Sequence, residues 1–426
     1  MSKPALLTLV LANFLTAEVH TLTLRQAIEL ALKQNPDVLM ARLDQQKAQQ
    51  AVRLARDPFR PRLAVGSGLA YSSGFPLSIE GSAPSIVEAR ASQFLFNQPQ
   101  RYLVAQAREH ARGAAISASG QAGEAAFRTA VLYVEAEQVA RQSISARRQV
   151  ESFENVERFV RARVAEEREL PIAARRAALN LAQARQAAES LAADLEHRER
   201  SLAEVLGLGG DDRVRPAEES RIAPPLPVSP ESAVASALKE SEELRALESK
   251  LISTGLELRS YRAARLPRMD LVAQYGLFAR FNNYEEFFRK FQRHNGQIGF
   301  SFQLPILTGT AAGAQAAQAE AELARLRVQM NAARNRISLA TRQAFNLVES
   351  ARRAAEVARL DLEVAREQVS INLALEQEGR ASLQQLEEAR VVEHGKWMAF
   401  YAAQQRLELA RLELLRRTGE LVAAIR

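Results

Sequence analysis

Residues 268–281 read RMDLVAQYGLFARF, and residues 297–304 read QIGFSFQL. Apolar and polar side chains alternate in both stretches, which is the period of a β-strand with one apolar face. The segment 282–294 between them predicts a hairpin loop. Each strand has about ten residues, the length that crosses a bilayer when tilted. The polar face opposite a continuous apolar face favours a membrane hairpin, while a small soluble sheet remains the alternative.

A second, weaker strand pair is expected earlier in the chain. We place its strands at about 62–72 and 86–96, and those of the stronger pair at about 268–281 and 296–305. Four strands are too few to close a barrel, and lipid does not tolerate open sheet edges. If the hairpins cross a membrane, several chains must therefore pool their strands.

The rest of the chain is expected to form long helices, because prolines are absent from four stretches rich in helix formers: 100–170, 172–215, 231–266 and 306–426. Apolar residues recur there at alternating spacings of four and three, the pattern of a coiled-coil seam. The longest such series is Leu326, Met330, Ala333, Ile337, Ala340, Ala344, Leu347, Ala351, Ala354 and Ala358.

The two halves of the sequence match each other. Pro61-Arg62-Leu63 recurs as Pro267-Arg268-Met269, 206 residues later, and Ala105-Gln106-Ala107 recurs as Ala317-Gln318-Ala319, 212 residues later. The six extra residues fall within the second hairpin, and we expect them in its loop 282–294. A duplicated unit of helix, strand, strand and long helical hairpin accounts for this pattern.

The repeat fixes the expected domain boundaries. The first repeat covers residues 18–207, with a helical hairpin at 100–206 that turns near 165–171. A Pro-rich linker follows at 208–230. The second repeat covers residues 231–426, with a helical hairpin at 312–422 that turns near 377–383.

Composition narrows the possible functions of the 426-residue chain. It has no cysteine, which excludes disulfides and thiolate metal sites, and its formal charge is +7. Residues 1–17 have the layout of a secretory signal peptide, and no later stretch is apolar enough for a membrane helix. No motif for catalysis, a cofactor or a metal emerges. Arginine pairs on the long helices would suit nucleic acid, but interleaved glutamates favour solvated helix faces.

These features together resemble the TolC-like outer membrane efflux proteins. The resemblance rests on the duplicated layout and on four segments, which are residues 24–32 (LRQAIELAL), 94–96 (FLF), 304–307 (LPIL) and 379–383 (GRASL). It implies a homotrimer with a 12-stranded outer-membrane barrel, in contact with lipid, above a coiled-coil α-barrel in the periplasm. It also implies a passive exit duct for efflux or type I secretion that contacts a periplasmic adaptor and an inner-membrane transporter.

The resemblance assigns candidate site residues to the two helical turns. It implies docking of the adaptor at Arg161, Arg163, Val164, Gly379, Ser382 and Leu383, and a pore constriction at Gln385 and Glu388. The first turn departs from the family pattern, because Glu167 stands at the glycine position and Pro171 supplies the helix start. Glu388 alone retains charge at the constriction, and it could equally be a solvated helix residue.

One alternative belongs to another class of protein. A periplasmic coiled-coil scaffold or adaptor would carry soluble strands and no membrane barrel. Such an adaptor should have a β domain between the halves of a single helical hairpin. This chain has two helical hairpins and two strand pairs, so we favour the channel.

Overall fold

The computed structural model describes residues 18–68, 85–219, 225–278, 292, 294–306 and 310–425. The expected signal peptide lies outside these residues. The chain divides into two compact units, and each unit draws on both halves of the sequence. Unit 1 comprises Met1–Met40, Ser119–Ser241 and Asn335–Arg426, and unit 2 comprises Ala41–Ala118 and Glu242–Arg334. The compact units therefore do not follow the repeat boundaries, because corresponding segments of the two halves pack together.

Helices dominate the described chain. They are α1 (Leu24–Gln34), α2 (Pro36–Arg56), α3 (Gln98–Ala165), α4 (Pro171–Val205), α5 (Pro230–Glu240), α6 (Glu242–Arg262), α8 (Ala311–Gln377), α9 (Leu383–Thr418) and α10 (Leu421–Ile425), with the short 3-10 helices η1 (Asp57–Phe59) and η2 (Ala263–Arg265). The strands are β1 (Val19–Leu22), β2 (Arg62–Gly68), β3 (Ser85–Asn97), β4 (Arg213–Pro216), β5 (Arg268–Phe278) and β6 (His294–Gln303). Among the described helices, none combines the length and the apolar composition needed to cross a membrane.

The duplication is visible in the element boundaries. Helices α1 and α5 each have 11 residues, and α2 and α6 each have 21. Helix α5 begins 206 residues after α1, and α6 begins 206 residues after α2. Helix α9 begins 212 residues after α4. Residues 282–291 and 293, in the loop where the six extra residues are expected, lie outside the described residues. The last described pairs of the two hairpins, Gly68↔Ser85 and Leu277↔His294, enclose segments of equal length, and the β5–β6 ladder is longer than the β2–β3 ladder.

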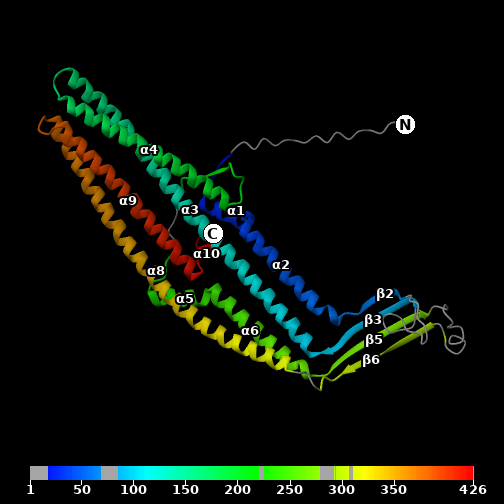
Figure 1. Ribbon diagram of the computed structural model, residues 1–426. Helices are drawn as coiled ribbons and strands as arrows, with labels where there is room; N and C mark the ends of the chain where they lie inside the picture. Colours follow the sequence, from blue (N-terminus) through cyan, green and yellow to red (C-terminus); the bar gives the residue numbers. More distant parts are fainter. Residues whose placement is uncertain are drawn as a thin grey trace, which may run out of the picture. The chain divides into compact units, whose positions relative to one another are not determined.

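Unit 2 contains a four-stranded antiparallel sheet in the order β2-β3-β5-β6 (Figure 1). The two hairpins join through β3 and β5, from Ser85↔Phe278 to Asn97↔Arg268. The strands differ slightly from the expected ranges. The end expected for the first strand and residues 279–281 lie outside the described residues, and β6 stops at Gln303 before Pro305, which has no N–H for the ladder.

The two faces of this sheet have opposite character. Register places Ala273 beside Ala91 and Ile298, and it places Gln274 beside Arg90 and Gln297. Because side chains alternate along a strand, these pairs define an apolar face and a polar face. The apolar face also carries Leu63, Val65, Leu271, Tyr275 and Phe300, with Gln93 and His294 as polar exceptions. The polar face carries Glu88, Ser92, Asp270 and Ser301, with Val272 and Phe94 as apolar exceptions.

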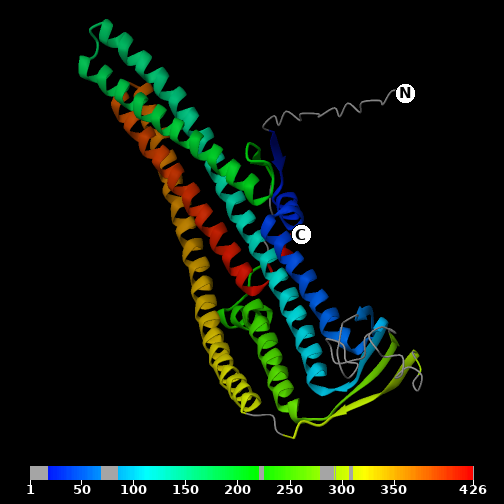
Figure 2. The same cartoon turned by 45° about the vertical axis from the view of Figure 1, so that its right-hand side comes forward.

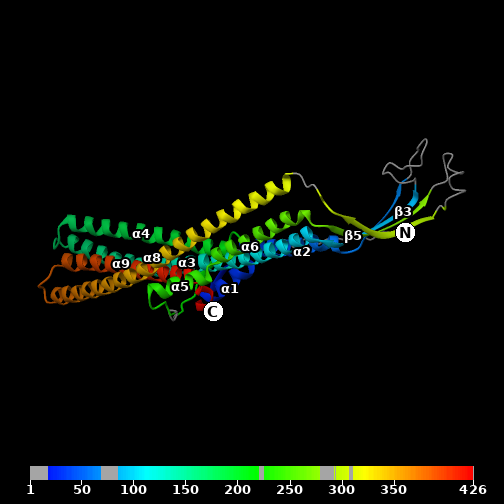
Figure 3. The same cartoon turned by 90° about the horizontal axis from the view of Figure 1, so that it is seen from below.

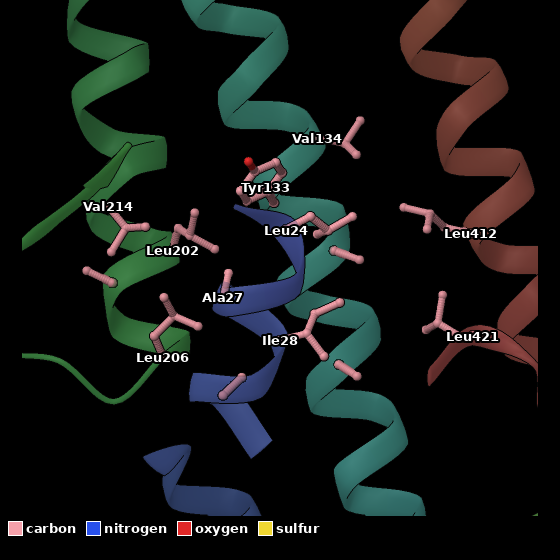
Figure 4. Packing of buried hydrophobic residues seen from close by; sticks show 14 of the residues in the cluster. Leu24, Ala27, Ile28, Tyr133, Val134, Leu202, Leu206, Val214, Leu412 and Leu421 are labelled. Atoms are coloured by element: carbon pink, nitrogen blue, oxygen red, sulfur yellow. The ribbon is translucent and has the colours of Figure 1, made fainter. Parts of the chain in front are cut away.

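Unit 1 contains the turns of two helical hairpins, α3–α4 and α8–α9, each an antiparallel pair (Figure 2). The two turns lie at the same end of unit 1 (Figure 3). At its other end, α1 packs into a core with α3, α4, β4 and the end of α9 (Figure 4). Tyr133 is fully buried there, and its hydroxyl donates to the Leu22 carbonyl at 3.1 Å.

The seam expected on α8 is only partly the buried one. Leu326, Ala333, Ala344 and Ala351 are buried, but Leu347 is 56% exposed while Val348 is buried in its place. Val348 joins Ala344, Ala351 and residues of α5 and α9 in a small cluster. A straight helix drifts relative to a strict seven-residue repeat, so the buried stripe moves by one position.

Strands β1 and β4 were not expected from the sequence. They form a parallel pair from Val19↔Arg213 to Leu22↔Pro216, and β4 lies within the expected linker 208–230. Four residues are too few to show a clear alternation. This pair ties the segment before α1 to the segment after α4.

Candidate functional site

The first hairpin turn is built on a left-handed residue that is not glycine. Helix α3 ends at Ala165, and Glu167 has φ +57°. The Glu167 N–H donates to the Val164 carbonyl at 3.1 Å, and the Arg168 N–H donates to the Arg163 carbonyl at 2.9 Å. This is the Schellman arrangement, which normally places glycine at the left-handed position. Helix α4 then starts at Pro171, whose fixed φ suits the first helical position.

The docking residues expected at this turn lie in the last turn of α3. Arg161 is exposed and ion-paired with Glu157. Arg163 lies 3.7 Å from the Glu169 carboxylate and 5.7 Å from the centre of the Phe159 ring. Val164 is half-buried. The two arginines therefore form a basic surface that local carboxylates partly neutralise.

The second turn repeats the same geometry with glycine. Gly379 has φ +71°, its N–H donates to the Glu376 carbonyl at 2.9 Å, and the Arg380 N–H donates to the Leu375 carbonyl at 2.8 Å. Ser382 is the N-cap of α9, which begins at Leu383. Its hydroxyl accepts from the Gln385 N–H, and the Gln385 side chain accepts from the Ser382 N–H at 2.9 Å. Gln385 therefore completes a capping box.

A pocket of about 400 Å³ lies between the ends of α8 and α9. It brings Gln385 and Glu388, the expected constriction residues, together with Arg380. On the α8 side, the Asn372 side chain donates to the Gln385 carbonyl at 3.3 Å and accepts from Gln368 at 3.0 Å. Both expected residues are exposed, and the Glu388 carboxylate accepts from Gln384 at 2.8 Å. The pocket therefore mixes polar and apolar side chains and carries one charge of each sign.

Sequence reasoning missed Glu387, the neighbour of Glu388. Its side chain is 12% exposed, and its Oε1 lies 3.2 Å from Arg390. The other carboxylate oxygen, Oε2, is buried and has no hydrogen-bond partner among the described residues. Burial raises the pKa of the Glu387 carboxyl above its ordinary value, and the Arg390 guanidinium opposes this rise. Glu387 and Arg390 are three residues apart on one helix, a spacing that indicates their ion pair from the sequence. Only the fold shows that the Glu387 carboxylate is buried.

The polar face of the sheet carries a hydrogen-bonded row across three strands. Arg90 on β3 lies 2.5 Å from Glu88, which accepts from Gln274 on β5 at 2.7 Å. Gln274 accepts in turn from Gln297 on β6 at 3.0 Å. Such a row needs water or other polar groups beside it, whereas the opposite face is mainly apolar, with Gln93 and His294 as polar exceptions.

The geometry matches solved structures along most of the chain. It resembles the outer membrane protein VceC of Vibrio cholerae with a TM-score of 0.74 and 17% identity, over 93% of this chain and 96% of VceC. It resembles the outer membrane channel CmeC of Campylobacter jejuni with a TM-score of 0.77 and 14% identity, over 93% of this chain and 86% of CmeC. This chain has the TolC-like fold.

A third match supports that conclusion. The outer membrane channel MtrE of Neisseria gonorrhoeae aligns with a TM-score of 0.74 and 17% identity, over 94% of this chain and 89% of MtrE. No family model matches the sequence, and no curated protein sequence matches it either. The TolC-like fold is thus shared with channels that are only 14–17% identical to this chain.

Proposed function

We propose that the chain is an outer-membrane channel that works as the passive exit duct of a tripartite efflux or type I secretion system. The sheet is the main observation behind this proposal, because one of its faces is mainly apolar and the other mainly polar. Within the described residues, neither β2 nor β6 pairs with a second strand. Three chains would pool four strands each into a 12-stranded barrel, with lipid outside and water inside.

The helical hairpins would then lie in the periplasm, with their turns as the contact surface. In this proposal Arg161, Arg163, Val164, Gly379, Ser382 and Leu383 contact a periplasmic adaptor that links the duct to an inner-membrane transporter. The repeated turn geometry supports this assignment, because six adjacent turns in a trimer would present similar backbone surfaces to the partner. Gln385 and Glu388 would line the constriction behind them. Transport energy would come from the transporter.

The decisive experiment is conductance of the detergent-purified protein in planar bilayers, with its mass measured in the same detergent. We expect a trimer that gives small and rarely open currents, since the turns close the duct without partners. Soluble monomers without membrane activity would overturn the proposal and leave the periplasmic scaffold.

The same recordings test the constriction. A ring of carboxylates favours cations, so Glu388→Ala should reduce the cation preference, read as a shift of the reversal potential in a salt gradient. Glu367→Ala removes the same charge from an exposed position of α8 outside the pocket and is the control. An unchanged reversal potential in Glu388→Ala would remove this residue from the pore.

A further inference from the structure

A pocket lined by arginines lies in unit 2, away from the helical turns. Its volume is about 460 Å³, and its lining consists of Arg56, Phe59, Arg60, Arg101, Val104 and Arg108. These residues come from the end of α2, from η1 and the residue after it, and from the first turns of α3. Among the residues that the structure describes, no carboxylate lines the pocket.

The carboxylates that follow Arg56 and Arg108 in the sequence are engaged elsewhere. Asp57 is ion-paired with Arg62, and Glu109 lies 3.8 Å from Arg112. Over the described ranges of the chain, the four pocket arginines make no ion pair, and Arg101 stacks 5.4 Å from the centre of the Phe96 ring. Four positive charges around one pocket repel one another, so a bound anion would stabilise all of them.

The pocket is held by contacts that do not involve the guanidiniums. The Gln100 side chain donates to the Ala55 carbonyl at 2.7 Å, which ties α3 to the end of α2. The Gln93 side chain donates to the Phe59 carbonyl at 2.9 Å, and the Phe59 ring packs edge-on against Phe94 at 6.1 Å. These contacts fix the backbone around the pocket, whereas the four arginine side chains are exposed and would become ordered on binding.

The second repeat shows that the fold does not require these charges. At its corresponding positions, Arg262 replaces Arg56, Leu266 replaces Arg60, Gly313 replaces Arg101 and Glu320 replaces Arg108. Glu320 lies 2.5 Å from Arg262, so this counterpart is neutralised internally. The arginine pocket is thus particular to the first repeat, although both repeats build the same backbone elements.

We propose that this pocket binds the phosphate of an anionic phospholipid headgroup. This inference rests on the proposed membrane barrel, because Arg60 precedes β2 by two residues and Arg101 follows β3 by four, at the ends of the strands where the membrane surface would lie. Guanidinium groups bind phosphate in a bidentate manner. Phe59 and Val104 supply an apolar wall for the carbons next to the phosphate, which a free phosphate ion would not use.

The test measures phosphatidylglycerol binding to the purified full chain in detergent by native mass spectrometry, with phosphatidylcholine as the uncharged comparison. Arg60→Gln combined with Arg108→Gln should weaken phosphatidylglycerol binding about 30-fold and leave phosphatidylcholine unchanged. Arg259→Gln combined with Arg265→Gln removes two exposed charges from the matching end of the second repeat and should have little effect.

Three outcomes would overturn the inference. One is an equal loss of binding in both double variants, and another is no loss in either. The third is displacement of the lipid by millimolar inorganic phosphate, which would make the pocket a site for the free ion. Conductance of the same wild-type sample separates the two proposals: conducting trimers without this lipid preference contradict only the lipid site, and an inactive soluble protein contradicts the barrel itself.

Discussion

Two glycines at equivalent positions of the repeats make equivalent close contacts with a neighbouring helix. Gly207 has φ +76° after α4, and Gly419 has φ +77° after α9. A β-carbon on Gly207 would lie 2.5 Å from the Gln34 carbonyl oxygen, and one on Gly419 would lie 2.7 Å from the Glu240 β-carbon. Gln34 and Glu240 are also counterparts, at the ends of α1 and α5. Each glycine therefore serves both its own turn and the packing of a neighbouring helix.

Gly207→Ala should destabilise the protein by about 2–3 kcal/mol, because left-handed strain adds to a clash with backbone. Gly379→Ala is the matched control: it has a similar φ, but nothing lies within 4 Å of the added carbon. That variant should lose only about 1 kcal/mol. Thermal unfolding of the purified protein gives both values, and equal losses would contradict the role of the Gln34 contact.

The buried carboxyl of Glu387 should make stability depend on pH. Its pKa is higher in the folded chain than in the unfolded chain, so the folded chain binds more protons, and stability falls as pH rises from the ordinary carboxyl range through the raised pKa. Glu387→Gln removes this loss. The variant should therefore gain melting temperature over wild type at neutral pH and not at acidic pH. Glu388→Gln, at an exposed position, is the control, and a gain independent of pH would contradict the argument.

At the scale of elements, the two hairpin turns use one backbone motif with different side chains. Glu167 and Gly379 hold the same left-handed position, and both turns close with the same pair of hydrogen bonds. The following helices start differently. Helix α4 begins with Pro171 and has no side-chain cap, whereas α9 begins with the Ser382 capping box. The Ser382 side chain therefore stabilises the start of α9, whereas no capping side chain stabilises the start of α4.

Ser382→Ala should therefore cost about 1 kcal/mol at the start of α9. The loss should appear as faster amide hydrogen exchange in the first turn of α9, next to Gln385. Ser190→Ala, at an exposed position inside α4, should leave exchange in α4 unchanged or slower, because alanine is the better helix former. Equal exchange in the first turn of α9 before and after the Ser382 substitution would show that the cap is unimportant.

For the whole molecule, the proposed membrane barrel depends on the sheet more than on any single residue. Its apolar face is exposed in the single chain, with Ile298 77%, Phe300 71% and Leu63 72% accessible. Its polar face holds the row from Arg90 to Gln297. Water on both sides would leave the apolar face uncovered, and lipid on both sides would leave the polar row unsatisfied.

Ile298→Arg should therefore block insertion into the outer membrane, because an arginine facing lipid costs about 2–4 kcal/mol at mid-membrane depth. Gln297→Arg adds the same side chain at the preceding residue, on the polar face. The control should reach the outer-membrane fraction normally. Fractionation of cells that express each variant gives the result, and equal distribution of the two variants would indicate that the apolar face does not meet lipid.

Local patterns predicted the elements well where the period was long and clear. The alternation around Gln274 and Ser301 correctly separated the two faces, and the match of Pro61-Arg62 with Pro267-Arg268 located equivalent strands. The exposed Leu347 and the buried Val348 were not foreseen, because a seam read from spacing ignores the gradual drift of a straight helix. The assignment of the turn residues as a docking site stays a prediction, and no sequence pattern indicated the burial of Glu387.

The sequence by itself determined the duplicated order of helices and strands, the positions of the turns and the two-faced character of the sheet. These follow from periodicity, proline placement and repetition, which are local properties of the chain. Only the tertiary structure decided which segments pair as β1 and β4, which carboxyls are buried and which arginines share a pocket. Burial and charge clustering arise between residues far apart in sequence, such as Arg60 and Arg101, and no local pattern encodes that proximity.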